Sequence, residues 1–254
     1  MTAAADHYDR LLAEHYTWML GGDIETVAAA QAELLHGLGL TAGPEEQAAA
    51  VDLGCGPGPQ TLALARLGFA SVTAIDSSAL LLDELMEHAR RSGVGQTVHP
   101  VREDIRGVLP RLTAAGSVAA VVCMGDTLPH LPARADVQQL IADVTKSLRP
   151  GGSFVASYRD LTRELHGPDR FIPVRSTADR ILTCFLEYLD QDTVLVHDLL
   201  HTRHDGAWHL KTSSYPKLRL SPQWLTDQCR MAGLDIRHDE TGPRGLRVLH
   251  AVKS

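Results

Sequence analysis

The sequence is short of positive charge: 24 Lys and Arg residues stand against 31 Asp and Glu residues, a formal net charge of −7 over 254 residues. Nucleic-acid backbones are bound by basic surfaces, so this balance excludes DNA or RNA as the main partner but is compatible with a small ligand that contains a nucleobase. No apolar run approaches the roughly 20 residues that cross a bilayer. The N-terminal stretch lacks the basic and apolar regions of a signal peptide, so we expect no membrane partner.

Cysteine pairs and metal-ligand spacings are also missing. The four cysteines are scattered, without CxxC spacing: Cys55, Cys123, Cys184 and Cys229. This pattern predicts neither a disulfide framework nor a zinc site, and it is typical of a cytoplasmic protein. Four histidines at 197, 201, 204 and 209 show no HExxH or facial-triad spacing. On an extended strand His197 and His201 share one face while His204 points the other way, so we expect a solvated strand face and no metal.

Residues 48–160 alternate short buried strands with amphipathic helices. The alternation predicts an α/β fold, a doubly wound Rossmann-like sheet of seven strands with right-handed crossovers. An N-terminal helical cap is expected over residues 1–45, with Asp23 capping its second helix, and the main domain over residues 46–254. Residues 171–220 lack helices and predict an antiparallel β insertion. Strands are expected at 48–53, 71–76, 97–104, 118–126 and 153–160, a helix that ends at the Pro-Gly-Gly of 150–152, and a helix capped by Ser221 before two closing strands.

Three glycines spaced two apart, Gly54, Gly56 and Gly58, follow the first predicted strand. A glycine-rich turn between a strand and a helix brings backbone N–H groups to a ligand, often a phosphate. However, the Gly-Lys-Ser/Thr of a P-loop is missing, and the spacing is GxGxG rather than the GxGxxG of dinucleotide sites. Asp52 precedes the loop, and Asp76 ends the next strand, where an acid accepts hydrogen bonds from ribose. The acids favour a cationic ligand, with a nucleotide-binding or purely structural sheet as the alternative.

In combination these features resemble class I S-adenosylmethionine (SAM) dependent methyltransferases over roughly residues 48–160. The matching segments are DLGCGPG at 52–58, AID ending at 76, ED ending at 104, CMGD at 123–126 and LRPGGSF at 148–154. The resemblance implies SAM as cofactor and S-adenosylhomocysteine as product, with Asp52 near the ammonium, Asp76 on the ribose and Asp104 on the adenine amino group. The implied cofactor-binding residues are Asp52, Gly54, Cys55, Gly56, Gly58, Asp76, Ser77, Asp104, Ile105, Cys123 and Met124, although Cys123 is equally typical of core packing.

The end of the fourth predicted strand is similar to glycine and sarcosine N-methyltransferases. Residues 125–131, GDTLPHL, match their Gly-Asn-Ser-Phe-x-His-Leu type segment, with Asp126 in place of the asparagine. Arg159 matches the arginine that holds the substrate carboxylate in those enzymes. A carboxylate accepts from an ammonium or takes a proton, so Asp126 and His130 are candidate bases. The alternatives are a helix cap for Asp126, a turn for His130, and a surface pair with Asp160 or Glu164 for Arg159.

Aromatic residues of the N-terminal helices are further candidates, because a segment that covers the site excludes water and positions the acceptor. Tyr8 and His15, seven residues apart, can share a helical face, whereas Tyr16 lies beside His15 and does not. Tyr16 is nonetheless included among the candidate catalytic residues, and Trp18 is a further candidate for covering the site. The alternative for all of them is amphipathic packing. Three alternating residues, Tyr215, Lys217 and Arg219, either line a substrate pocket or form an exposed stripe.

The sequence therefore predicts a methyltransferase that acts on a small molecule, with an amine or amino acid nitrogen as acceptor. Its candidate catalytic residues are Tyr16, Asp126, His130 and Arg159. Methylation at oxygen or carbon, another alkylation by SAM, and a non-catalytic SAM-binding regulator are the alternatives. The 171–220 insertion is compatible with a lid or with the interface of a homodimer.

Overall fold

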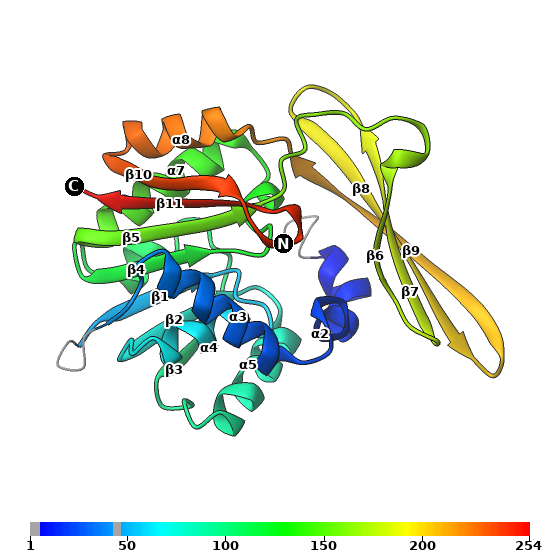
Figure 1. Ribbon diagram of the computed structural model, residues 1–254, viewed down its shortest axis with the longest axis horizontal. Helices are drawn as coiled ribbons and strands as arrows, with labels where there is room; N and C mark the ends of the chain where they lie inside the picture. The colour runs from blue at the N-terminus through cyan, green and yellow to red at the C-terminus, as the bar shows by residue number, and fades with distance from the viewer. Residues whose placement is uncertain (1–5, 43–46) are drawn as a thin grey trace.

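The computed structural model describes residues 6–42 and 47–254, and it contains two sheets (Figure 1). The predicted domain boundary at residues 45 and 46 lies outside the described residues. The strands of the larger sheet are β1 (Ala49–Leu53), β2 (Ser71–Asp76), β3 (Val98–Arg102), β4 (Val118–Cys123), β5 (Leu148–Tyr158), β10 (Leu234–Thr241) and β11 (Arg247–Lys253). Their order is β10-β11-β5-β4-β1-β2-β3, with only β11 antiparallel to its neighbours. The predicted seven-stranded, Rossmann-like sheet is confirmed.

Helices cover both faces of this sheet. On one face lie α3 (Ile24–Gly37), α4 (Pro59–Arg66) and α5 (Ala79–Arg91); on the other lie α6 (Leu109–Leu112), α7 (Arg134–Ser147) and α8 (Pro222–Met231). The predicted caps are confirmed, because Asp23 accepts from the Glu25 amide and Ser221 from the Trp224 amide. No helix within the described ranges is both long and apolar enough to cross a membrane.

The boundary between α7 and β5 differs from the sequence-based expectation. The predicted helix ends at the Pro-Gly-Gly of 150–152 and the next strand starts at 153, but α7 ends at Ser147 and β5 starts at Leu148. Val118 pairs with Leu148, and the register then shifts so that Ala120 pairs with Ser153. Residues 149–152 form this irregularity, which accommodates Pro150 and two glycines that a regular strand excludes.

The second sheet is the predicted antiparallel insertion. It consists of β6 (Phe171–Ser176), β7 (Arg180–Tyr188), β8 (Thr193–His204) and β9 (Ala207–Leu218), paired in that order. Burial alternates along β8, and His197 and His201 share its half-exposed face, as predicted. His197 contacts Glu187 and Ser214. Among the residues that the structure describes, no cluster of three or more His, Cys, Asp or Glu side chains is arranged to hold a metal ion.

The N-terminal segment lies between the two sheets and is wound irregularly (Figure 1). It comprises a π turn η1 (Tyr8–Leu12), a 3₁₀ turn η2 (Ala13–His15) and the short helix α2 (Tyr16–Leu20). The expected face shared by Tyr8 and His15 is wrong, because the π and 3₁₀ turns change the helical phase. Tyr8 instead faces Tyr16, with their ring centroids 5.6 Å apart. Trp18 stacks against Arg175 and Arg180.

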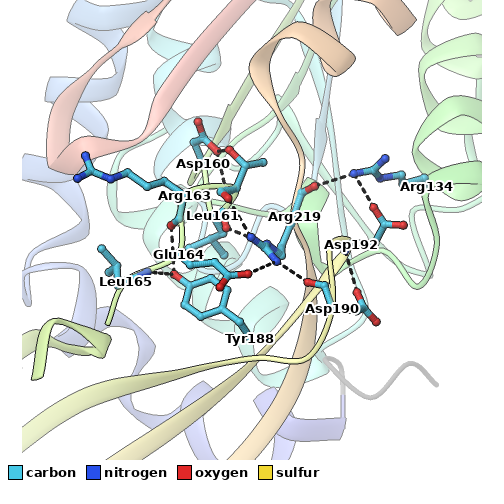
Figure 2. A network of polar contacts seen from close by, with 11 residues as sticks. Arg134, Asp160, Leu161, Arg163, Glu164, Leu165, Tyr188, Asp190, Asp192 and Arg219 are labelled. Atoms are coloured by element: carbon cyan, nitrogen blue, oxygen red, sulfur yellow. Dashed lines mark hydrogen bonds and ion pairs between the residues drawn. The ribbon is translucent and has the colours of Figure 1, made fainter. Parts of the chain in front are cut away.

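Arg219 fixes the second sheet to the first (Figure 2). It lies at the end of β9, is 5% exposed, and covers the ring of Tyr188 at 5.0 Å. Its guanidinium donates to the carbonyls of Leu161, Thr162 and Asp190 and to the Glu164 carboxylate, and its own carbonyl accepts from Arg134, which pairs with Asp192. Arg219 is thus a structural residue. It neither lines a substrate pocket nor belongs to an exposed stripe, the two alternatives that the sequence left open.

Gly58, the third glycine of the loop, allows α4 to pack on α5. It has φ +93 and is the N-cap of α4. A Cβ atom at this position would lie 2.0 Å from Cδ1 of Leu85. The absence of a side chain at Gly58 is therefore explained by helix packing.

We expect Gly58→Ala to lower the free energy of unfolding by about 2–4 kcal/mol, because it combines a strained backbone with an overpacked contact. Gly233→Ala is the matched control, since Gly233 has φ +89 but open space around its Cβ position; it should cost about 1 kcal/mol. Urea denaturation followed by circular dichroism makes the comparison. Equal losses in the two variants would show that the Leu85 contact has no effect.

Candidate active site

Two cavities meet at the carboxyl ends of the parallel strands. The first, which we call the loop cavity, measures ≈ 370 Å³ and is lined by residues of the glycine loop, the end of β2, residues 102–105 and residues 125–131. The second, the inter-sheet cavity, measures ≈ 620 Å³ and is lined by the N-terminal segment, the end of β5 and strands β6 to β9. Tyr8, Tyr16 and Gly125 line both cavities and separate them. The strand ends of an open α/β sheet are where such folds bind ligands.

Asp76 holds the glycine loop in place. One carboxylate oxygen accepts from the Gly56 amide and the other from the Ser78 amide, both at 2.9 Å. The amides of Gly54 and Cys55 donate to the Ile75 carbonyl, so the loop is tied to the end of β2. Asp76 also lines the loop cavity, where the sequence places it.

The first two glycines of the loop both have positive φ angles, and at Gly54 a side chain would also clash. A Cβ atom at Gly54, which has φ +73, would lie 2.5 Å from Cγ2 of Thr127. A Cβ atom at Gly56, which has φ +53, would lie 3.4 Å from Cε1 of Tyr16. Both glycines line the loop cavity, so their bare backbone is available to a ligand as well.

The other predicted cofactor residues divide into two groups. Ser77, Asp104 and Ile105 line the loop cavity. Burial raises the pKa of Asp104, but hydrogen bonds from the side chain and amide of Arg106 hold it below its usual value. Five residues line neither cavity: Asp52, Cys55, Gly58, Cys123 and Met124.

All five of these residues are buried behind the cavity walls. Cys55, Cys123 and Met124 are at most 4% exposed and belong to the hydrophobic core. Cysteine and methionine side chains commonly pack in this way. Asp52 is 1% exposed and accepts from the Thr61 hydroxyl at 2.7 Å. Burial raises the pKa of Asp52 to about 7.

Asp126 makes a buried ion pair that the sequence did not indicate. It follows β4 with φ 75, and its carboxylate accepts from Lys217 Nζ of β9 at 2.6 Å and from the Arg159 amide at 2.8 Å. The alternative of a helix cap is wrong, since the following turn η3 (Leu128–His130) has no side-chain cap. Lys217 and Tyr215 both line the inter-sheet cavity and are buried, so these two residues do not form an exposed stripe.

Arg159 lines the inter-sheet cavity, and its guanidinium has no acidic partner among the described residues. The surface pair with Asp160 or Glu164 is therefore wrong; Glu164 pairs with Arg219 instead. An unpaired guanidinium at the edge of a cavity is available to an anionic group.

Aromatic rings form the partition between the cavities. The ring of His130 lies 5.4 Å from that of Tyr8 and 5.2 Å from that of Tyr215. Burial, together with Lys217 and His7, holds the pKa of His130 well below its usual value, so its imidazole is neutral at physiological pH. Burial raises the pKa of Tyr16 to about 12 and that of Tyr8 well above its usual value, so both phenols keep their protons.

His7 and Asp198 form a second buried pair, which the sequence analysis missed. His7 Nε2 lies 2.8 Å from an Asp198 carboxylate oxygen, and Cys184 Sγ donates to the other oxygen. The sequence did contain an indication of this pair. Asp198 lies two residues from Val196 and from Leu200, so in a strand it points to the same buried face as these apolar residues. An acid at such a position requires a buried partner.

Asp52 gives a pH-dependent contribution to stability. Its native pKa of about 7 lies above the usual value of 3.8, so the native state binds the proton more tightly than the unfolded state does. The free energy of unfolding therefore falls as pH rises through the window from 3.8 to about 7, at on the order of 1.4 kcal/mol for each pH unit.

We expect Asp52→Asn to remove this fall. Urea denaturation of the ligand-free protein at about pH 4 and about pH 8 gives the difference between the wild type and the variant, and the variant should gain relative stability at the higher pH. Asp83→Asn, which alters an exposed carboxylate, is the control. A difference that does not change with pH would contradict the assignment.

Residues 50–152 match the family model described as "Methyltransferase domain". The ubiquinone biosynthesis O-methyltransferase of Xanthomonas axonopodis pv. citri is 38% identical over 109 residues, which cover 42% of this chain and 41% of the relative. The chain thus spans less than half the length of this curated relative.

Two solved structures are similar over nearly the whole chain. SAM-bound CalS10 from Micromonospora echinaspora, an amino pentose methyltransferase, gives a TM-score of 0.73 at 16% identity, covering 95% of this chain and 96% of CalS10. A SAM-dependent methyltransferase from Clostridium acetobutylicum gives 0.71 at 16% identity, covering 99% and 98%. The chain therefore has the Rossmann-like fold of SAM-dependent methyltransferases, and its residues 50–152 match the methyltransferase domain family.

Proposed function

We propose that the protein transfers the methyl group of SAM, bound in the loop cavity, to a small molecule bound in the inter-sheet cavity. The observation that carries this proposal is the shared wall: Tyr8, Tyr16 and Gly125 line both cavities. A donor and an acceptor in adjoining compartments are held close together, which is what a direct transfer between them needs.

The loop cavity suits a cationic nucleoside. Three acids line it, Asp76, Glu103 and Asp104, against one basic residue, Arg102. The backbone of Gly54 and Gly56 would lie against the amino-acid part of the ligand. Asp76, which also accepts from the Gly56 and Ser78 amides, would accept from the ribose hydroxyls, and Asp104, which also accepts from Arg106, would accept from an adenine amino group. When bound, SAM supplies an electrophilic methyl group on a sulfonium.

The acceptor atom that fits the inter-sheet cavity best is an amine nitrogen. The two carboxylates of the cavity are both engaged, Asp126 with Lys217 and Asp198 with His7. His130 is a weak base, because burial lowers its pKa. An amine that arrives neutral already has its lone pair and needs no base, whereas an alcohol has to lose a proton. The amino pentose named for CalS10 agrees with such an acceptor.

Oxygen that is already ionised, as in a phenolate or carboxylate, is the second candidate. The same lack of an unpaired base is compatible with it, and the similar ubiquinone biosynthesis enzymes are O-methyltransferases. Arg159 would hold a carboxylate of the acceptor in either case, as the resemblance to glycine and sarcosine N-methyltransferases implies.

Asp76 tests the cofactor site. We expect Asp76→Asn to weaken binding of S-adenosylhomocysteine by about 100-fold in isothermal titration calorimetry, because a charged acceptor of two hydroxyl groups is lost. Asp83→Asn, on the exposed face of α5, should leave the affinity unchanged. Unchanged affinity in the Asp76 variant would overturn the cofactor assignment.

Tyr16 tests the partition. Its ring packs against Gly56, so we expect Tyr16→Ala to lower transfer of labelled methyl from SAM into the small molecules of a cell extract by about 100-fold. Tyr16→Phe keeps the ring and should retain activity within about tenfold. Binding of S-adenosylhomocysteine without any methyl transfer by the unmodified protein would favour a SAM-binding regulator instead.

A further inference from the structure

Three arginines from distant parts of the sequence line the inter-sheet cavity. Arg159 follows β5, Arg175 belongs to β6, and Arg244 lies in the short turn η5 (Pro243–Gly245) that precedes β11. Arg159 and Arg175 are half-buried, and Arg244 is exposed. Three elements thus each contribute one guanidinium to a single cavity.

Their positions converge on one rim of the cavity, formed by the end of α2 and by η5. Nη2 of Arg175 lies 3.6 Å from the Cβ position of Gly22, and Nη2 of Arg244 donates to the carbonyl of Leu20 at 2.5 Å. Nη1 of Arg159 lies 3.9 Å from the Cβ position of Gly245, the neighbour of Arg244. The N-terminal segment therefore holds two of the arginines beside the cavity, and η5 brings the third to the same region.

The carboxylates that line the inter-sheet cavity do not neutralise these arginines. Asp126 and Asp198, the two carboxylates that line the cavity, are paired with Lys217 and His7. None of the three arginines forms an ion pair with an acid among residues 6–42 and 47–254. Three cationic side chains thus line one cavity of a chain whose net charge is −7, which makes the cavity locally attractive to an anion.

Backbone strain at Arg244 is a second observation. Arg244 adopts φ 59 and ψ 20, a left-handed conformation that costs a residue other than glycine roughly 1 kcal/mol. The strained turn directs its side chain to the rim. Strain of this kind persists where surrounding contacts enforce it, and it is concentrated at binding sites.

The remainder of the cavity is largely apolar. Its walls include Leu161, Ile172, Pro173, Leu186 and Val196. A volume of ≈ 620 Å³ accommodates a drug-sized molecule. A ligand that fits this cavity has an apolar body and an anionic group at one end.

We propose that the methyl acceptor carries a carboxylate or phosphate group, which Arg159, Arg175 and Arg244 bind at the rim of the inter-sheet cavity. Its apolar body lies against β6 to β8, and the accepting atom points toward Tyr8 and Tyr16. Guanidinium groups bind carboxylates and phosphates through paired, charge-assisted hydrogen bonds, which gives the site its selectivity for these anions. The proposal rests on the proposed methyl transfer, because it assigns this cavity to the acceptor.

The test uses three probes of similar shape: benzoate, phenyl phosphate and the neutral benzamide. Calorimetric titration of the full chain, saturated with S-adenosylhomocysteine, should show at least one anion binding about tenfold or more tightly than benzamide. Tighter binding of phenyl phosphate identifies a phosphate group, and tighter binding of benzoate a carboxylate. Affinity for the anion should fall as KCl is added. Benzamide binding as tightly as both anions, or no saturable binding of either anion, would overturn the proposal.

Single variants locate the site. Arg159→Gln, Arg175→Gln and Arg244→Gln should each weaken anion binding by about 5- to 30-fold and leave benzamide binding unchanged. Arg230→Gln is the matched control, because Arg230 is an exposed arginine of α8 far from the cavity lining. Unchanged anion affinity in all three variants would contradict the assignment.

Binding of S-adenosylhomocysteine, titrated separately, distinguishes the two proposals. All four variants should bind it with wild-type affinity, because none of these arginines lines the loop cavity. Anion binding without binding of S-adenosylhomocysteine by the wild type would remove the proposed function and keep an anion site. Binding of S-adenosylhomocysteine with no preference for anions over benzamide would keep the proposed function and remove the anion site.

Discussion

The geometry of the inter-sheet cavity depends on the buried ion pair between Asp126 and Lys217, both of which line it. The pair joins the end of β4 to β9 across 2.6 Å, with the two side chains 13% and 10% exposed. Removing either partner leaves an uncompensated charge in the interior, which costs several kcal/mol. The other oxygen of Asp126 accepts from the Arg159 amide, so the same carboxylate also fixes the end of β5. Because Asp126 is committed to these contacts, it shapes the inter-sheet cavity and is not an unpaired base.

The N-terminal segment completes the site that this pair frames. The His7–Asp198 pair attaches the segment to β8, and the contact of Tyr16 with Gly56 attaches it to the glycine loop. One short, irregular stretch therefore contacts both cavities. Its Tyr8 and Tyr16 rings lie at the partition, where they restrict access of water. The two carboxylates that line the inter-sheet cavity, Asp126 and Asp198, are both paired and do not act as bases. Position and desolvation are consequently the means of catalysis that this arrangement offers.

Most of the fold could be predicted because its signals are local. The alternation of strands and helices, Asp23 and Ser221 as caps, and the helix-free insertion are all visible within short windows of sequence. The glycine spacing and the acid at the end of β2 likewise placed Gly54, Gly56, Asp76 and Asp104 at one edge of the sheet. The errors arose where the chain departs from regular geometry. The π turn of η1 rotated Tyr8 toward Tyr16, and the register shift at the start of β5 absorbed a Pro-Gly-Gly that signalled the end of a helix.

The sequence by itself determined the parallel sheet, the glycine loop and the acids that surround it, because adjacent residues of the first five strands and their loops carry that information. Only the tertiary structure decided which charges are paired. Asp126 with Lys217, Asp198 with His7, and Arg219 with the carbonyl of Asp190 are contacts between residues 29 to 191 positions apart. No local pattern encodes such pairs, since a buried charge is satisfied by whichever partner the fold brings to it. The same folding left Arg159, Arg175 and Arg244 lining one cavity, with no acidic partner in the part of the chain that the structure describes.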